Sequence, residues 1–328
     1  MSSEMAPAYI SLFESGELRR RVDTAFQMLK ACTVCPRKCR TTRLSGGIGA
    51  CSAGLEIHVS SIGPHFGEEP PLTGTSGSGT VFFSHCNLHC LFCQNHQISQ
   101  QGIGNEISYE DLADQYVELQ ELGCHNINLV SPTPWGPQIL KTVLLACERG
   151  LRIPLVYNSG GYDSFDMLRL FEGVVDIYLP DMKYGNSKSA AQLSGIQNYV
   201  IHNQACVREM FRQVGLLRLD ENGIAQRGLI VRHLVLPNDK ADSREVFRFL
   251  ADELSEYIAV SLMSQYSPQY RAHSIPELNR PITRKEYETA LRWFHESGLT
   301  GGYIQEMPSH ETGLPDFAED EPFDWSQK

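Results

Sequence analysis

Residues 80–93 read TVFFSHCNLHCLFC and join an apolar run to three cysteines, Cys86, Cys90 and Cys93. The apolar run predicts a buried strand that ends just before the first cysteine. A closed structural zinc site usually takes four protein ligands, whereas a site that performs chemistry keeps one coordination position open. Three thiols in a loop after a strand therefore indicate a metal ion or cluster that also binds a small molecule.

Strand and helix signals alternate after this loop. Ser108 with Asp111, and Thr283 with Glu286, are capping boxes that predict the starts of two helices. We expect further strands at 127–130, 153–158, 174–181, 228–237 and 258–263, and further helices at 137–149, 164–171, 197–214 and 243–255. Near-continuous apolar strands covered by helices predict an α/β fold with a parallel sheet, and about six strand and helix pairs suit a partial (β/α)6 barrel. Functional groups in such barrels follow the carboxyl ends of the strands.

The chain divides by composition into three parts. Residues 1–79 form a cysteine-rich N-terminal segment with a charged helix near 16–30, residues 80–305 hold the barrel repeats, and residues 306–328 form a C-terminal tail. The glycine-rich run GTSGSG at 74–79 precedes a strand and opens no helix, so we interpret it as a turn rather than a nucleotide-binding loop.

Composition excludes several classes of protein. The 328 residues carry a net charge of −11, which disfavours a broad nucleic-acid surface. No run of 18 apolar residues is present, and the first ten residues, MSSEMAPAYI, lack the features of a signal peptide. We therefore expect a cytoplasmic protein with no membrane partner. Its ten cysteines are then predicted to be metal ligands or buried thiols rather than disulfides, and the isolated Cys124, Cys147 and Cys206 are predicted core residues.

Two kinds of centre are consistent with the three motif cysteines, Cys86, Cys90 and Cys93. They could form a zinc site completed by a nearby histidine, or hold three irons of a four-iron cluster. The form CxxxCxxC, with Phe92 before the last cysteine and a strand before the loop, resembles the radical S-adenosylmethionine (radical SAM) superfamily. The resemblance implies a [4Fe–4S] cluster whose fourth iron binds SAM. It also implies reductive cleavage of SAM to a 5′-deoxyadenosyl radical that takes a hydrogen atom from a substrate.

Segments along nearly the whole chain are similar to a glycyl-radical-activase-like branch of that superfamily, the group named after pyruvate formate-lyase activating enzymes. They are CNLHCLFCQN, NLVSPTP, VYNSGGY, VDIYLPDMKYG, VRHLVLPN and SLMSQY, preceded by CTVCPRKC and GPHFGEEPPLTG. The likeness implies a glycine of a glycyl radical enzyme as substrate and a flavodoxin or ferredoxin as electron donor. Two alternatives remain: a radical SAM enzyme that acts on a small molecule or another peptide, and a non-enzymatic iron–sulfur or zinc protein.

The resemblance also implies residues that contact SAM, although it assigns no catalytic residue. Ser131 and Thr133 occupy the position where activases carry a Gly-Gly-Glu stretch whose backbone receives the SAM amino group, so this chain departs from the pattern there. Asp181 and Lys183 match an Asp-x-Lys at the end of the fourth strand. The expected SAM-binding residues are Ser131, Thr133, Asn158, Asp181, Lys183, His233 and Tyr266.

Arg232 and His233 are neighbours within one predicted strand, so one of them must face inward. A buried arginine needs a counter-charge, which could be a bound carboxylate or an acidic side chain. Ahead of the first strand, His58, His65, Glu68 and Glu69 are candidates for positioning a substrate or moving a proton, or are solvated turn residues.

A second set of cysteines lies near the N-terminus, at Cys32, Cys35, Cys39 and Cys51, with Pro36 after the second. Four thiolates suit a closed zinc site and suit an auxiliary iron–sulfur cluster equally well. The spacing decides neither, and free thiols are the remaining alternative. An auxiliary cluster could relay electrons, whereas zinc would only hold the segment to the barrel.

Overall fold

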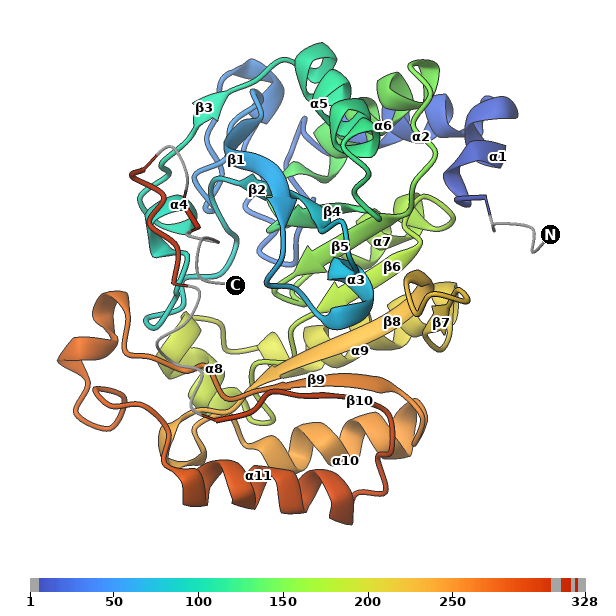
Figure 1. Ribbon diagram of the computed structural model, residues 1–328. Helices are drawn as coiled ribbons and strands as arrows, with labels where there is room; N and C mark the ends of the chain where they lie inside the picture. Colours follow the sequence, from blue (N-terminus) through green and yellow to red (C-terminus); the bar gives the residue numbers. More distant parts are fainter. Residues whose placement is uncertain (1–5, 308–313, 320–321, 324–328) are drawn as a thin grey trace.

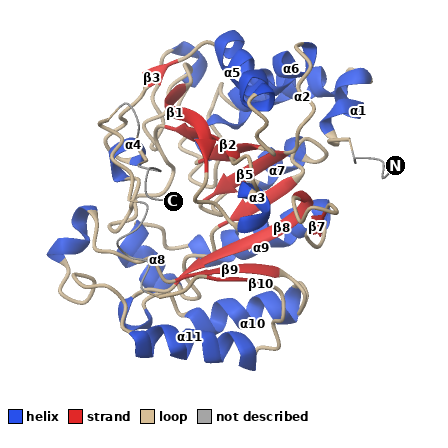
Figure 2. Ribbon diagram, viewed as in Figure 1, coloured by secondary structure: helices blue, strands red, loops and turns tan. Residues whose placement is uncertain are grey.

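The computed structural model describes residues 6–307, 314–319 and 322–323. A mostly parallel sheet runs through its centre and is flanked by helices (Figures 1 and 2). The parallel strands, in spatial order, are β2 (Ser78–Phe83), β4 (Ile127–Val130), β5 (Leu155–Ser159), β6 (Ile177–Pro180), β8 (Ala225–Leu234), β9 (Ala259–Met263) and β10 (Gly302–Ile304). Three antiparallel strands complete the sheet: β1 (His58–His65) beside β2, β3 (Asn105–Glu106) beside β1, and β7 (Arg218–Leu219) beside β8. The α/β class predicted from the alternation is thus confirmed.

Most expected helices lie within a few residues of their predicted bounds. The helices along the chain are α1 (Tyr9–Glu14), α2 (Glu17–Gln27), α3 (Pro70–Thr73), α4 (His96–Ser99), α5 (Tyr109–Glu121), α6 (Gly136–Glu148), α7 (Phe165–Phe171), α8 (Ser187–Ser194), α9 (Tyr199–Val214), α10 (Ser243–Glu253) and α11 (Arg284–Glu296). Both predicted N-caps form: the Ser108 hydroxyl accepts from the Asp111 amide at 3.0 Å, and Thr283 and Glu286 make a full capping box.

Side chains of the sheet alternate between two apolar environments. One set packs under the helices in the main core, which includes Leu129, Tyr157 and Val231. The other set faces inward and forms a smaller cluster of Leu72, Val156, Ile177, Leu179, Ala225, Ile230 and Ala259. We call this second side of the sheet the inner face. Both faces are buried, which explains why the strands read as continuous apolar runs rather than alternating ones.

Several short elements were not expected from the sequence, and three of them are instructive. Strand β1 contains Gly63, Pro64 and several polar residues, yet it pairs antiparallel with β2 over residues 59–65. Helix α8 lacks a long apolar stripe and is defined by its ends, where the Asn186 side chain accepts from the Ser189 amide and Gly195 takes a left-handed conformation. Strand β10 is three residues long, too short to carry a periodicity.

The N-terminal segment packs closely on the rest of the chain. Helix α2 lies against α6, and β1 joins the central sheet across the predicted boundary at residue 79. The described part of the predicted tail also makes contacts, because Phe317 and Phe323 pack on Phe82 with ring centroids 5.2 Å away in each case. No helix among the described residues is both long enough and apolar enough to cross a bilayer.

Candidate functional site

The three motif cysteines lie in the loop that follows β2 at the carboxyl end of the parallel sheet. His85, just before them, has a left-handed backbone with φ of 71°, which turns the chain sharply out of the strand. Cys90 Sγ lies 2.9 Å from the Ser194 hydroxyl, and Cys93 Sγ lies 3.2 Å from the Ser99 hydroxyl. Two hydroxyls from different helices therefore point at sulfurs of this loop.

Burial raises the pKa values of the three motif thiols, so they lose their protons only when a positive charge is close. It raises the pKa of Cys86 to about 12 and that of Cys93 to about 11, and it raises the pKa of Cys90 as well. The positive charge of Lys183 acts on all three in the opposite direction. A metal centre would supply the larger compensating charge, because thiolates are its ligands.

Among the described residues, no group of three Cys, His, Asp or Glu side chains is arranged to hold a single metal ion. The three motif thiols suit a four-iron cluster in which each thiolate binds a different iron. The backbone of Gly160 approaches this loop closely, since a Cβ at this position would lie 2.6 Å from Leu88 Cδ1 and 3.8 Å from Lys183 Cε.

Asp181 and Lys183 follow β6 and form an ion pair of 2.5 Å between Oδ2 and Nζ. Burial lowers the pKa of Lys183, but the negative charges of Asp181 and of a Cys90 thiolate outweigh it and hold the lysine firmly protonated. The pair thus lies beside the motif cysteines at the end of the sheet where the sequence predicted it.

A buried ionic cluster occupies the inner face nearby. Arg232 of β8 pairs with Glu69 through two hydrogen bonds of 2.7 Å, and it also contacts Glu68. Its Nη1 lies 3.5 Å from the Asn158 amide oxygen of β5. The counter-charge that the sequence required for Arg232 is therefore supplied by the two glutamates from the loop after β1, and His65 Nε2 lies 3.9 Å from Glu68.

The two glutamates differ in protonation behaviour. Burial raises the pKa of Glu68, although Arg232 acts against it. For Glu69 burial also disfavours the charge, but the paired guanidinium outweighs it and holds its pKa below the usual value. Glu69 is thus the firm ionic partner of Arg232, whereas Glu68 is the carboxyl group that takes up a proton more readily.

Two of the predicted site histidines lie elsewhere. His233 faces α10: its ring nitrogens lie 2.7 Å from the Met182 carbonyl and 2.9 Å from the Ser243 hydroxyl, and its ring packs on Phe247. Strand alternation turns Arg232 inward and His233 outward, so both ring nitrogens of His233 lie away from the inner face, where the prediction of SAM binding had placed this residue. His58 stacks on Trp135 and does not join the cluster of Glu68 and Glu69.

Thr133, Tyr266 and Ser131, the next three predicted SAM contacts, each have a partner within the protein. The Thr133 hydroxyl donates to buried Asp163 at 2.7 Å, so its side chain is directed behind β5, and only the backbone of this turn remains for the predicted role. The Tyr266 hydroxyl donates to the Leu278 carbonyl at 2.8 Å, and its ring lies 6.0 Å from Phe92, so Tyr266 supports the cysteine loop by packing. Ser131 has a left-handed backbone with φ of 61°, and its amide donates a hydrogen bond to the Asn158 carbonyl at 3.0 Å.

Ser194 and Ser99 were missed as site residues from the sequence. Neither serine belongs to a recognisable motif, and Ser194 reaches Cys90 across 104 positions of the chain. Only the fold of α8, itself unexpected, brings this hydroxyl to the loop.

Comparison with known proteins shows the family of this chain. The family model described as "Radical SAM superfamily" matches residues 80–251, which include the cysteine loop and strands β2 to β8. Among curated proteins, the uncharacterized protein MJ0674 of Methanocaldococcus jannaschii is 33% identical over 280 residues, which are 83% of this chain and 76% of that protein. A second protein of that organism, MJ0808, is 26% identical over 69% of this chain and 62% of its own length.

Solved structures are more distant. A radical SAM methyltransferase from Sphaerobacter thermophilus aligns with a TM-score of 0.47 at 14% identity, over 69% of this chain and 65% of that chain. SuiB of Streptococcus suis, solved with the precursor peptide SuiA, aligns with a TM-score of 0.47 at 11% identity, over 68% of this chain and 47% of that one. The family model covers more than half of the 328 residues and contains the cysteine loop, and the chain belongs to the radical SAM superfamily.

Proposed function

We propose that this protein uses a [4Fe–4S] cluster on Cys86, Cys90 and Cys93 to cleave SAM and to abstract hydrogen from a substrate. When bound together, the cluster and SAM supply the electron and the 5′-deoxyadenosyl radical for this chemistry. The observation that carries the proposal is the position of Lys183, whose charge acts on all three motif thiols while its Nζ pairs with Asp181.

The residues of this chain then bind and orient SAM. Lys183 suits the carboxylate of the methionine moiety, and Asp181 suits its ammonium group, because opposite charges attract strongly in a site of low polarity. The amide oxygen of Asn158 and the backbone of the turn at 131–133 offer further polar contacts at the carboxyl ends of β5 and β4. Phe92 of the cysteine loop packs against Tyr266, and these buried rings help to exclude water.

We also propose that the sheet forms the partial (β/α)6 barrel of this superfamily. Arg232 of β8 reaches Asn158 of β5 although β6 lies between these strands. Such a contact favours a sheet that curves around its inner face.

The substrate proposed first is a glycine residue of a glycyl radical enzyme, as the activase-like sequence segments suggest. A small molecule or another peptide is the second candidate, and one observation favours it. Arg232, Glu68 and Glu69 form a buried charged layer on the inner face, and such groups recognise a polar substrate more specifically than a glycine residue requires.

The experiment that tests the proposed function is anaerobic. The protein is reconstituted with iron and sulfide, SAM and dithionite are added, and 5′-deoxyadenosine is quantified for the wild type and for Cys90→Ala. Formation that depends on Cys90 supports SAM cleavage. If the cluster is present and SAM binds but no 5′-deoxyadenosine forms, the proposal is overturned in favour of the electron-carrier or scaffold alternative.

The substrate is tested separately. Deuterium transfer into 5′-deoxyadenosine from a glycine-deuterated glycyl radical enzyme would support the activase reading, whereas transfer only from a small-molecule or peptide pool would support the second candidate. A flavodoxin or a ferredoxin remains the proposed electron donor in either case.

A further inference from the structure

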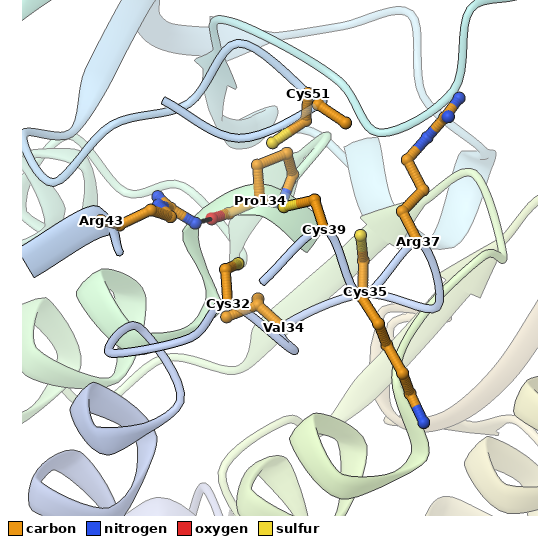
Figure 3. A pocket seen from close by; sticks show the side chains of 10 residues that line it. Cys32, Val34, Cys35, Arg37, Cys39, Arg43, Cys51 and Pro134 are labelled. Carbon is orange, nitrogen blue, oxygen red and sulfur yellow. Dashed lines mark hydrogen bonds between the residues drawn. The ribbon is translucent and has the colours of Figure 1, made fainter. Parts of the chain in front are cut away.

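The four front cysteines, Cys32, Cys35, Cys39 and Cys51, line one pocket together with Val34, Arg37, Lys38, Arg43, Ala50 and Pro134 (Figure 3). We propose that they hold a second iron–sulfur cluster of the four-iron type. We also propose that this cluster passes electrons to the motif cysteines. The binding site stands on its own observations, whereas the electron transfer rests on the proposed function.

A buried cation lines this pocket. Arg43 is fully buried, its Nε donates to the Gly54 carbonyl and its Nη1 to the Pro134 carbonyl, both at 2.7 Å. Its Nη2 has no hydrogen-bond partner among the described residues. A buried guanidinium nitrogen without a partner is costly, and it indicates an anionic group in the pocket. A four-iron core with four thiolates has a net charge of about −2, which supplies that anion.

The backbone around the front cysteines matches that around the motif cysteines. For three cysteines of the front set and two of the motif set, a backbone hydrogen bond from the residue two positions further along lowers the pKa of the thiol: Arg37 on Cys35, Thr41 on Cys39, Ala53 on Cys51, Leu88 on Cys86 and Asn95 on Cys93. Amide hydrogen bonds of this kind stabilise cluster thiolates and tune their potential. Both sets of thiols therefore have backbone surroundings that suit thiolate ligands of a metal centre.

The pocket also requires unusual backbone conformations. Lys38, Arg40 and Ser52 have left-handed φ angles of 42°, 60° and 65°, and they flank Cys39 and Cys51 directly. Three such residues next to two cysteines represent strain that a structural turn alone does not require. A Cβ on Gly49 would lie 3.3 Å from Cys51 Sγ and 3.7 Å from Cys39 Sγ, so the loop backbone approaches both sulfurs closely.

Four thiolates suit zinc and a four-iron cluster equally well, and the position of the pocket favours the cluster. A zinc ion has no redox chemistry and would serve only to hold the segment to the barrel. The front cysteines lie next to the loop of the motif cysteines, where a redox centre is in place to exchange electrons with the motif cluster.

Asn87 links the two sets of cysteines. Its side chain hydrogen-bonds to Cys35, and its Oδ1 lies 4.0 Å from Cys86 Sγ. Two further contacts hold the loops together: Arg37 Nε donates to the Asn87 carbonyl at 2.6 Å, and His89 Nε2 lies 3.3 Å from the Ala50 carbonyl. One buried side chain therefore touches a ligand of each proposed cluster.

The proposed electron transfer moves one electron through the two neighbouring clusters. An external one-electron donor, such as dithionite or a reduced flavodoxin or ferredoxin, reduces the front cluster. That cluster is reoxidised as one electron passes to the motif cluster, and no proton or atom moves. Each SAM cleavage consumes one such electron.

The test compares three variants with the wild type after anaerobic reconstitution. The motif variant is Cys86→Ala/Cys90→Ala/Cys93→Ala, the front variant is Cys39→Ala/Cys51→Ala, and the matched control is Cys124→Ala/Cys147→Ala, which removes two buried cysteines outside both sets. Iron, sulfide and zinc are measured per chain. We expect about eight irons in the wild type and the control, and about four in each of the other two variants.

Several outcomes would overturn the proposal. About four irons with one zinc in the wild type would assign the front site to zinc, and about four irons without zinc would leave the front cysteines as free thiols. The motif variant keeps its front cysteines, so about four irons bound to this variant would support the front site even if the front variant fails to fold. This measurement does not depend on SAM cleavage, so the front site can fail while the proposed function holds, and the reverse.

A reductive titration tests the electron transfer. The wild type should accept two electrons per chain, and the motif and front variants one each. With reduced flavodoxin as donor, the front variant should lose reduction of the motif cluster, while dithionite should still reduce it directly. Equal reduction of the motif cluster by flavodoxin in the wild type and the front variant would refute the relay and leave the binding site intact.

Discussion

Arg232 and Glu69 form a buried two-bond ion pair on the inner face of the sheet, with Nε to Oε1 and Nη2 to Oε2 both at 2.7 Å. The pair joins the loop after β1 to strand β8, two parts of the chain that the sequence pattern does not connect. It also fixes the charge of the layer beneath the proposed SAM site.

The first prediction concerns this pair. Arg232→Met should reduce the free energy of unfolding by about 3–5 kcal/mol, because it leaves two carboxylates buried without a counter-charge. Chemical denaturation measures the loss. Adding Glu68→Gln and Glu69→Gln to the variant should recover much of it, and Arg248→Met, which breaks an exposed pair with Glu245, should change stability little. Equal losses for Arg232→Met and Arg248→Met would contradict the assignment.

The second prediction concerns SAM binding. Lys183→Met should weaken binding of SAM to the reconstituted protein by about ten- to a hundredfold, since it removes a charged hydrogen bond in a buried site. Equilibrium dialysis with labelled SAM measures this effect. Lys188→Met removes an exposed lysine from the next helix and serves as the control. If both lysine variants bind SAM as the wild type does, Lys183 has no contact with it.

The third prediction concerns the cluster potential. When Cys90 is a thiolate ligand, the Ser194 hydroxyl donates to it and stabilises the more negative, reduced cluster. Ser194→Ala should therefore make the midpoint potential more negative in a redox titration followed by electron paramagnetic resonance. Tyr184→Phe removes the other partner of Ser194, which lies 2.6 Å away, but keeps the contact with Cys90. An unchanged potential in Ser194→Ala would show that the hydroxyl does not act on the cluster.

The fourth prediction concerns pH. Burial lowers the pKa of His233 from the ordinary 6.5 to about 4, so the folded protein keeps this ring neutral while the unfolded chain takes up a proton. The stability contribution is complete above pH 6.5 and is lost as the pH falls toward 4. Between pH 7.5 and 4.5 the wild type should lose about 2–3 kcal/mol more than His233→Gln.

Chemical denaturation at the two pH values measures that difference. His273→Gln, at an exposed histidine, should behave as the wild type does. A wild type and His233→Gln that lose stability in parallel would mean that the ring is protonated in the folded state.

The sequence predicted those parts of the fold that depend on local signals. Capping residues and apolar runs located α5, α11 and the parallel strands, because both depend on neighbours in the chain. It could not decide which of Arg232 and His233 faces inward, since β8 is buried on both sides and shows no alternation. Strand β1 was missed because its pairing with β2, rather than its own composition, makes it a strand.

The candidate site, like the fold, was predicted where the signal is local in the sequence. Cys86, Cys90, Cys93, Asp181 and Lys183 lie in short motifs after strands, and the fold brings them together. Thr133, His233 and Tyr266 were assigned by position alone, and each side chain is committed to a partner away from the inner face or beneath the loop. Contacts such as Ser194 with Cys90 require the path of the whole chain and have no local signal.

Glu69 and Arg232 are 163 positions apart in the chain, so Glu69 is synthesised well before its partner. During synthesis the two glutamates leave the ribosome long before β8 does, and they stay hydrated until the arginine arrives. The inner face therefore cannot close around its charged layer strand by strand. Its completion is a late event, because a nascent chain that ends before residue 232 lacks the counter-charge of both glutamates.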